Sequence, residues 1–180
     1  WSDEMKNIEE IALRLQDVGI AALTIHGRTR SQMYRGEADW TLIGKIKNDP
    51  RITIPIIGNG DVTTPQRAKE CFDKYGVDGI MIGRATFGDP WIFQQVSAAM
   101  AGQEVPERPV LKDRIAVAVK QFELSEQDHG EHIACLEARK HFAWYLRGVR
   151  NASYYKKEIT SMNKMEDIYR IARDIVRDLE

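Results

Sequence analysis

Two short apolar runs, each ending in a glycine-containing polar turn, constrain the fold of this chain more than any other feature. Residues 52–58 read Ile-Thr-Ile-Pro-Ile-Ile-Gly and are followed by Asn-Gly-Asp at 59–61, whereas residues 79–84 read Gly-Ile-Met-Ile-Gly-Arg. Between the runs, Thr64-Pro65 and Gly76 mark the start and end of a helix. Apolar strands that alternate with helices are typical of a parallel sheet buried on both faces.

A repeated pattern adds a third strand to this prediction. The sequence Gly19-Ile20, an apolar run and His26-Gly27-Arg28 is echoed by Gly76-Val77, an apolar run and Gly83-Arg84. A recurring strand, turn and helix is the unit of a (β/α)8 TIM barrel, whose eight units need roughly 250 residues. We therefore predict the α/β fold class and the C-terminal part of such a barrel, with strands at Ile20–Ile25, Ile52–Ile57 and Gly79–Ile82.

Three strands cannot close a barrel, so the edges of the predicted sheet would be open to pairing between copies of the chain. Pro55 lies within the second predicted strand and cannot donate a hydrogen bond to a neighbouring strand. We therefore expect the paired part of that strand to begin at the proline, after a looser lead-in.

Helical periodicity predicts the other elements in the first part of the chain. Three helices are expected: from Asp3 to Val18, from Asp39 to Lys47, and from Asp89-Pro90 to about Met100. Ser2, Asp39 and Asp89 are residues of the type that caps the start of a helix.

The strand signal disappears after residues 102–109, whose glycine and prolines are typical of a linker. Apolar residues then recur at helical spacing in three segments, 110–127, 131–146 and 165–179. We predict an all-α helical bundle in this part of the chain and place the boundary between the two domains at residues 104 and 105.

Composition and termini exclude several classes of protein. The formal net charge of −1 gives no global electrostatic field that would reveal a partner, and no run of about 18 apolar residues predicts a membrane span. Cys71 and Cys135 lie far apart within helical patterns, so we expect two reduced, structural cysteines and no metal site. The chain begins at Trp1 without an initiator methionine, which suggests a fragment, and its first residues are not a secretory signal.

The polar turns after the second and third predicted strands form the first candidate site. Gly58-Asn59-Gly60-Asp61 and Gly83-Arg84 would lie side by side, because parallel strands place their functional groups at their carboxyl ends. Backbone N–H groups of glycine turns and a guanidinium are the groups that bind a phosphate. The alternative is a tight strand-to-loop turn with Arg84 in an ordinary surface salt bridge.

His26 ends the first predicted strand and would face the same edge of the sheet. An imidazole there can donate a hydrogen bond to a flavin ring or a substrate carbonyl. A histidine bonded to a neighbouring loop is the alternative. Arg30, Tyr34 and Arg35 follow in an irregular segment and could contact an anionic substrate, although long exposed loops often carry arginines without such a role.

The segment from Arg139 to Lys157 is the second candidate site. It contains seven basic residues, no Asp or Glu, and five interleaved aromatic residues. Basic groups bind phosphates and aromatic rings can stack on bases, so this combination is typical of RNA contact. The alternative is a solvated helix face whose aromatic rings lie in the core.

Taken in order, these segments resemble the tRNA-dihydrouridine synthase family, most closely its bacterial B-type branch. The resemblance covers nearly the whole chain. It rests on residues 23–30 (Leu-Thr-Ile-His-Gly-Arg-Thr-Arg), 34–40 (Tyr-Arg-Gly-Glu-Ala-Asp-Trp), 54–61 (Ile-Pro-Ile-Ile-Gly-Asn-Gly-Asp), 78–84 (Asp-Gly-Ile-Met-Ile-Gly-Arg), 90–93 (Pro-Trp-Ile-Phe), and on Arg139-Lys140-His141 with Trp144-Tyr145.

The resemblance implies a cytoplasmic flavoprotein whose barrel holds FMN and whose helical domain, residues 105–180, binds tRNA. It implies that NADPH reduces the flavin and that hydride then passes to C6 of an extruded uridine, while a cysteine acid protonates C5. The residues that match the family's FMN contacts are His26, Asn59, Gly60, Asp61, Gly83 and Arg84. Those assigned to RNA contact are Arg139, Lys140, His141 and Arg147.

The resemblance also implies that this chain is the C-terminal half of such an enzyme, with the catalytic cysteine and the first five strands upstream of Trp1. We therefore expect the polypeptide alone neither to bind FMN tightly nor to reduce uridine. Two other interpretations stay open at this point. One is a different FMN- or phosphate-binding TIM-barrel oxidoreductase, of the dihydroorotate or old-yellow type. The other is a non-catalytic RNA-binding fragment.

Overall fold

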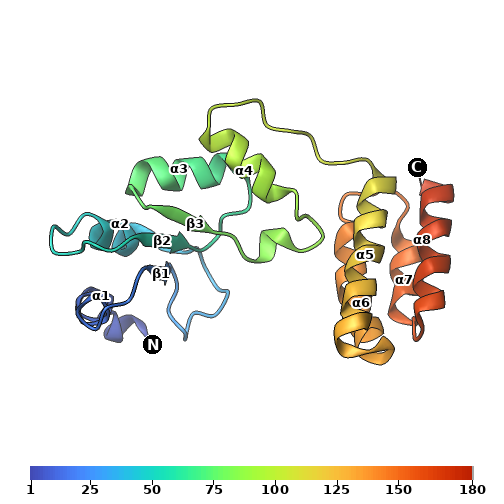
Figure 1. Cartoon of the computed structure of the whole chain (residues 1–180), viewed down its shortest axis with the longest axis horizontal. Coiled ribbons are helices and arrows are strands. Elements are labelled where there is room, and N and C mark those ends of the chain that lie inside the picture. The colour runs from blue at the N-terminus through green and yellow to red at the C-terminus, as the bar shows by residue number, and fades with distance from the viewer. Residues whose placement is uncertain (180) are drawn as a thin grey trace. The chain divides into compact units, whose positions relative to one another are not determined.

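Residues 1–179 are described by the computed structural model, and they divide into two units (Figure 1). The first unit comprises Trp1–Ala85 and Ile92–Pro106. The second comprises Thr86–Trp91 and the chain from Glu107 onward. Each unit has its own cluster of buried hydrophobic residues, so each is described separately.

The first unit is built on a parallel sheet of three strands in the order β1-β2-β3 (Figure 1). Its strands are β1 (Leu23–His26), β2 (Ile56–Asn59) and β3 (Gly79–Met81). Ile25 is opposite Gly58, and Gly58 is opposite Ile80. The predicted mixed α/β class with a parallel sheet is confirmed, and this arrangement is consistent with part of a TIM barrel.

The strand β2 begins later than the sequence predicted. Residues 52–55 precede the paired part, as expected from Pro55, whose carbonyl accepts a hydrogen bond from Leu23 N at 3.0 Å. The Gln16 side chain holds this lead-in by accepting from Thr53 N at 2.7 Å and donating to Arg51 O at 2.9 Å. The predicted start of the first strand at Ile20 is likewise wrong by three residues, because pairing begins only at Leu23.

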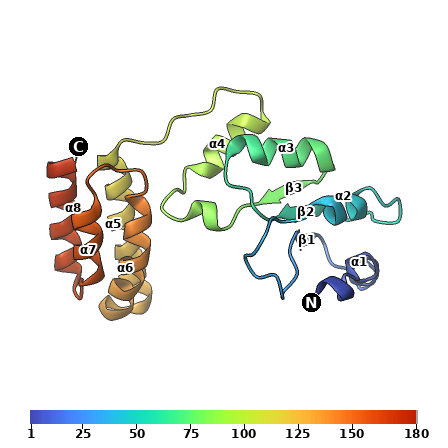
Figure 2. The same ribbon diagram turned by 180° about the vertical axis from the view of Figure 1, so that it is seen from behind.

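Helices surround this sheet in the first unit. They are α1 (Ile8–Asp17), α2 (Thr41–Lys47), α3 (Pro65–Tyr75) and α4 (Ile92–Met100), with short 3-10 turns η1 (Asp3–Met5) and η2 (Arg84–Thr86). Figure 2 shows α3 and α4 together along one side of the sheet. Ile43 and Ile46 on the buried face of α2, and Trp40 immediately before it, lie in the same core cluster as Cys71 of α3.

The sequence signals placed both ends of α3 and of α8 and the end of α2 at Lys47 correctly, but they placed the starts of α1 and α4 too early. Thr64 accepts a hydrogen bond from Arg67 N, and Gly76 ends α3 with a positive φ of 67°. The prediction that Ser2 caps a helix is wrong, because its side chain makes no capping bond. The helix predicted from Asp89-Pro90 begins only at Ile92, and the Asp89 carboxylate lies 3.3 Å from Arg108 Nε.

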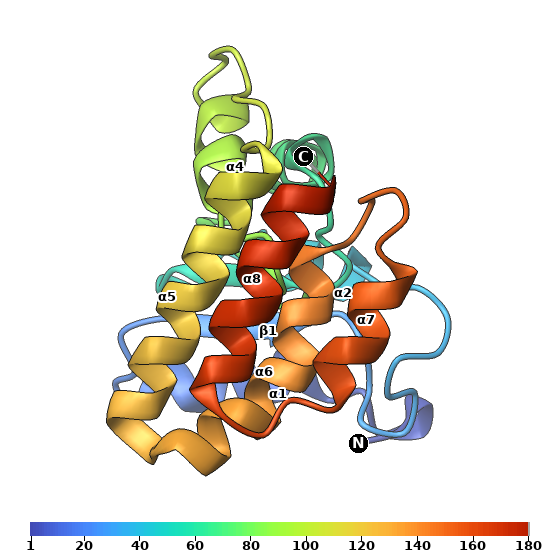
Figure 3. The same ribbon diagram turned by 90° about the vertical axis from the view of Figure 1, so that its right-hand side faces the viewer.

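The second unit contains four helices packed around one hydrophobic cluster. They are α5 (Leu111–His129), α6 (Glu131–Tyr145), α7 (Ser153–Thr160) and α8 (Met165–Leu179). Figure 3 shows α5 next to α8, and α6 packs against α5, α7 and α8. Phe122 of α5 and Phe142 of α6 meet in this core with ring centroids 5.4 Å apart. The sequence analysis did not predict α7.

A short segment, Thr86–Trp91, belongs to the second unit although it precedes α4 in the chain. The Phe87 ring stacks on Trp144 of α6, with centroids 4.2 Å apart and planes 8° from parallel. Gly88 follows with a φ of 67°, and a Cβ there would lie 2.3 Å from the carbonyl carbon of Trp144. Only glycine therefore permits this close approach of the segment to α6.

Within residues 1–179, no helix combines the length and the apolar character that crossing a bilayer requires.

Candidate functional site

The carboxyl ends of the three strands lie at one edge of the sheet. His26 at the end of β1 is opposite Asn59 at the end of β2, and Asn59 is opposite Met81 at the end of β3. The Asn59 side chain donates from Nδ2 to Met81 O at 2.8 Å, and Gly27 N donates to Asn59 O at 2.9 Å. The strand register thus brings His26, the turn after β2 and the turn after β3 together.

Asp61, in the turn after β2, is the centre of the polar contacts at this edge. Arg28 donates to both carboxylate oxygens, from Nη1 to Oδ1 at 2.8 Å and from Nη2 to Oδ2 at 2.7 Å. Ala38 N donates to Oδ2 at 2.8 Å, and Arg84 Nη2 donates to Oδ1 at 3.1 Å. The hydrogen bonds from Arg28 are the main cause of a lowered pKa of Asp61, and Ala38 N–H and the Arg84 charge act in the same direction.

Arg28 is the site residue to which the sequence analysis assigned no role. Its side chain is only 3% exposed, although it carries a full positive charge. Besides Asp61, it donates to Gly36 O at 2.6 Å and to Arg35 O at 3.4 Å. The repeated Gly-Arg dipeptide at the ends of the first and third strands was the available signal, because it gives Arg28 the same position in its unit as Arg84.

The glycines of the site differ in what surrounds them. A Cβ on Gly58 would lie 2.2 Å from the Trp40 ring, and one on Gly60 would lie 2.6 Å from Ala38 Cβ. Packing within the protein is therefore enough to require glycine at these two positions. A Cβ on Gly83 would meet no atom within 4 Å, so internal packing does not explain that glycine. The absence of a side chain at Gly83 therefore leaves room for a ligand beside the strand end.

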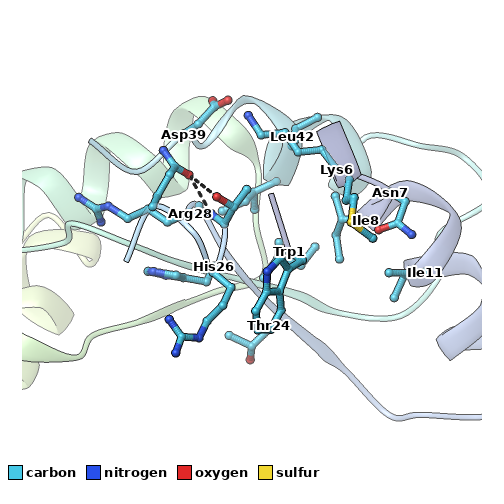
Figure 4. A pocket seen from close by; sticks show the side chains of 17 residues that line it. Trp1, Lys6, Asn7, Ile8, Ile11, Thr24, His26, Arg28, Asp39 and Leu42 are labelled. Carbon is cyan, nitrogen blue, oxygen red and sulfur yellow. Dashed lines mark hydrogen bonds between the residues drawn. The ribbon is translucent and has the colours of Figure 1, made fainter. Parts of the chain in front are cut away.

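His26 lies beside a cavity of about 350 Å³ in the first unit (Figure 4). Trp1, Ile8, Arg28 and Arg30 also contribute to its walls. A cavity of this volume falls in the size range of small-molecule sites. The position of His26 therefore permits contact with a ligand that enters this cavity.

The irregular segment that follows β1 places the Tyr34 side chain beside Arg84, at the edge of the sheet where the strands end. The Arg84 guanidinium carbon lies 4.4 Å from the centre of the exposed Tyr34 ring. Arg30 lies over the Trp1 ring at 5.7 Å, and Arg35 donates to Ser31 O at 3.1 Å. Tyr34 and Asp61 thus contact the Arg84 guanidinium from two different elements.

The second candidate site, in the helical unit, presents a group of exposed cations. Their side chains make no ion pair with any residue between 1 and 179; they are Lys140, Arg147, Arg150, Lys156 and Lys157. The Lys140 ammonium lies 5.2 Å from the centre of the Trp144 ring. We call these five residues the basic surface. Cations without carboxylate partners keep their full charge for a polyanion.

Arg139 and His141 are placed differently from the basic surface. Arg139 donates from Nε to Met162 O at 2.8 Å and from Nη2 to Asn163 Oδ1 at 2.7 Å, which ties α6 to the turn before α8. The His141 ring packs edge-on against Trp144 at 4.8 Å, and its burial lowers its pKa. Both side chains therefore have roles within the helical unit itself.

Two arginines fix the turn that carries Arg147. The buried Arg114 donates to Tyr145 O, at the end of α6, and lies 3.4 Å from Arg147 O. Arg108 donates to the same Arg147 O at 3.1 Å and to Gly88 O at 2.7 Å. Positive charge at a helix C-terminus is favourable because the last carbonyls lack helical partners. The sequence analysis did not identify either arginine.

The two cysteines belong to the hydrophobic cores of the two units. Cys71 and Cys135 are buried and reduced, and burial raises the pKa of each thiol. Across residues 1–179, no group of three or more His, Cys, Asp or Glu side chains is arranged to hold a metal ion.

Comparison with known proteins agrees over nearly the whole chain. The family model described as "Dihydrouridine synthase (Dus)" matches residues 1–179. A "Probable tRNA-dihydrouridine synthase" of Rickettsia conorii is 35% identical over 163 residues, which are 91% of this chain and 49% of the relative. A "tRNA-dihydrouridine synthase B" of Pasteurella multocida is 36% identical over 162 residues, covering 90% of this chain and 48% of the relative.

A third relative gives the same result. The "tRNA-dihydrouridine synthase B" of Vibrio cholerae is 36% identical over 165 residues, which are 90% of this chain and 50% of the relative. The chain spans about half the length of the curated relatives it matches. With a family match from residue 1 to residue 179, and with the sequence resemblance confirmed, the chain belongs to the dihydrouridine synthase family.

Proposed function

We propose that this chain supplies an FMN-binding edge and an RNA-binding surface to a tRNA-dihydrouridine synthase, which reduces uridine to 5,6-dihydrouridine in tRNA. The family match carries this proposal, because it includes both the strand-end turns and the basic surface. It favours this reaction over those of other FMN barrels. Because tRNA is the proposed substrate, we place the enzyme in the cytoplasm, and we propose NADPH as the reductant on the family resemblance alone.

The residues at the edge of the sheet fit the phosphate end of FMN. Gly83 has open space where a side chain would be, and Arg84, half exposed, offers a guanidinium beside it. Amide N–H groups and a guanidinium together make a phosphate site. We propose that Gly83 and Arg84 bind the phosphate, and that Asn59 and Gly60 form the neighbouring wall.

We assign the remaining edge residues to positioning and flavin contact. When bound, FMN would carry hydride from NADPH to C6 of the uridine. His26, beside the cavity, would donate a hydrogen bond to the flavin ring or the substrate. Asp61 would orient Arg84 through the hydrogen bond between them. Neither cysteine fits the acid that the family resemblance implies, because each is buried in a hydrophobic core cluster.

The helical unit would form the tRNA-binding domain, a helical bundle attached to the partial TIM barrel. The cations of the basic surface support this assignment, because they have no carboxylate partners within the described chain and Trp144 lies beside Lys140. We keep Lys140 and Arg147 as direct phosphate contacts. Arg139 and His141 would act mainly by fixing α6, as their internal contacts indicate.

A chimera tests the catalytic part of this proposal. These 180 residues would replace the matching half of the Pasteurella multocida relative, in a bacterium that lacks its own B-type enzyme. We expect mass spectrometry to detect dihydrouridine in its tRNA, and we expect R84A to lower the amount more than R84K. A folded chimera that retains flavin but yields no dihydrouridine would contradict the proposal.

Binding of tRNA by the chain tests the RNA-binding part. We expect electrophoretic mobility shifts whose affinity falls steeply with salt, and a salt slope reduced by about 2 in the double variant K140A/R147A. K69A is the matched control, because Lys69 is paired with Asp73 in α3. Equal losses in both variants would argue against the basic surface.

The basic surface also favours a second candidate, an RNA-binding fragment without catalysis. The same two experiments separate the candidates. Salt-dependent tRNA binding together with an inactive chimera would support the second.

A further inference from the structure

We propose that Arg28 is a positioning residue for the anionic ligand of this edge: by neutralising Asp61 it leaves the charge of Arg84 available to a phosphate group. This inference rests on the proposed function, because it assigns the ligand's phosphate to Gly83 and Arg84. Arg28 itself would not touch the ligand, since its side chain is only 3% exposed.

The distances indicate which arginine is the main partner of Asp61. Arg28 makes two hydrogen bonds, at 2.8 and 2.7 Å, in the bidentate geometry that gives the strongest pairing with a carboxylate. Arg84 makes a single bond at 3.1 Å, and its side chain is 50% exposed. The buried Arg28 is therefore the main partner of the Asp61 carboxylate, and the exposed Arg84 guanidinium is bound to it only weakly.

The net charge of the three groups follows from this arrangement. Arg28, Asp61 and Arg84 together carry +1, and the half-exposed member presents that charge at the strand ends. Without Arg28 the sum would be zero. Asp61 would then draw Arg84 into the pair, and a phosphate would have to compete with a carboxylate for the same guanidinium.

Arg28 also fixes the surroundings of Arg84. Its Nη2 donates to Gly36 O at 2.6 Å, and Ala38 N donates to the Asp61 carboxylate at 2.8 Å. These bonds hold the segment after β1, which carries Tyr34 to within 4.4 Å of the Arg84 guanidinium. Arg28 therefore also has a structural contact with this segment, separate from its effect on the charge of Asp61.

Titration of the isotope-labelled chain with inorganic phosphate tests the proposal. At low ionic strength we expect saturable shifts of the Gly83 and Arg84 backbone amide signals in NMR spectra. R28M should weaken the fitted phosphate affinity about tenfold, the effect of one unit charge a few ångströms from a partly exposed site. R28K keeps the charge but loses the bidentate geometry, so its affinity should lie between the two.

A double variant separates charge from structure. R28M/D61N removes one positive and one negative charge and so restores the net charge of +1. We expect its phosphate affinity to return to within about threefold of the original, because Arg84 is again free of a competing carboxylate. If R28M were weak only because the segment after β1 had lost its shape, the double variant would stay weak, and the proposal would be overturned.

The remaining outcomes distinguish this inference from the proposed function. If the original chain responds to phosphate at Gly83 and Arg84 but R28M binds equally well, the positioning role is wrong and the phosphate site stands. If the original chain shows no response at these amides, both are wrong. Dispersed amide signals across β1, β2 and β3 verify that each variant is folded.

Discussion

The first unit buries twelve hydrophobic residues in its core cluster, and the second buries eighteen in a shorter stretch of the described chain. The second unit consists of helices, which satisfy their backbone hydrogen bonds internally and need only bury an apolar face. In the first unit β1 and β3 each pair only with β2 within residues 1–179. A sheet, unlike a helix, leaves unpaired backbone groups on its edge strands, so its stability depends on what pairs with those strands.

The two units also differ in how they hold their candidate sites. At the strand ends, charged and polar contacts centred on Asp61 hold the site residues in place, and the exposed Arg84 is one of these contacts. On the helical unit the exposed cations are carried by helices and turns that are held together by apolar packing. The comparison therefore predicts large effects of core truncation in the second unit and smaller, local effects of polar changes in the first.

Truncation of Phe142 should have the largest effect. Its side chain is fully buried against Phe122, so F142A should lower the free energy of unfolding of the helical unit by about 3–5 kcal/mol. Urea unfolding monitored through amide signals of α5 to α8 measures this. L136A on the same helix is the control, because Leu136 is 42% exposed and should cost much less. Equal losses would mean that the apolar core does not dominate this unit.

The close approach at Gly88 should have the next largest effect. In G88A the new Cβ would meet backbone atoms of Trp144 and Tyr145, which cannot move without displacing α6, so we expect a loss of about 1–3 kcal/mol from overpacking alone. G148A is the matched control, because Gly148 has a φ of 80° but open space around it. Its substitution should therefore cost only about 1 kcal/mol, the backbone strain that an alanine has at a positive φ. Thermal unfolding of both variants gives the difference.

The packing of Thr86–Trp91 also shows what sequence reasoning could not supply. Asp89-Pro90 is a local signal for a helix start, but α4 begins two residues after Pro90, at Ile92, and the Asp89 carboxylate lies 3.3 Å from Arg108 Nε. Such a contact joins residues nearly twenty positions apart. Local capping rules contain no information about it, so the structure overrides them.

Other signals that depend only on neighbouring residues were reliable. Thr64-Pro65 and Gly76 correctly bounded α3, because a cap, a proline and a left-handed glycine act within one helical turn. Parallel pairing was also predictable from apolar runs separated by helices. Arg28 was missed for the opposite reason: its partner Asp61 lies 33 residues away, and the repeated Gly-Arg dipeptide marks the position of Arg28 but not the ion pair it forms.

The cap of α3 offers a smaller test in the first unit. T64A removes the hydroxyl that accepts from Arg67 N, so we expect a loss of about 1 kcal/mol, concentrated at the start of α3. Hydrogen exchange of the amides in its first turn measures this. T63A, at the exposed neighbouring position, is the control and should change little. A global loss as large as that of F142A would contradict the distinction drawn between the units.

The smallest expected effect concerns protons rather than packing. Burial lowers the pKa of His141 below its ordinary value near 6.5, so the unfolded chain takes up a proton at a higher pH than the folded chain does. The contribution of neutral His141 to stability is therefore complete above about pH 6.5 and is lost as the pH falls below that value. NMR titration of the ring proton should show the lowered pKa.

F87A should raise the pKa of His141 toward its ordinary value, because Phe87 covers the ring from 5.8 Å and its removal admits water. H141Q should flatten the decline in unfolding free energy below about pH 6.5, since no imidazole remains to take up the proton. If F87A leaves the titration of His141 unchanged, the segment Thr86–Trp91 does not shield this ring. The segment Thr86–Trp91 would then pack less tightly against α6 than the stacking of Phe87 on Trp144 indicates.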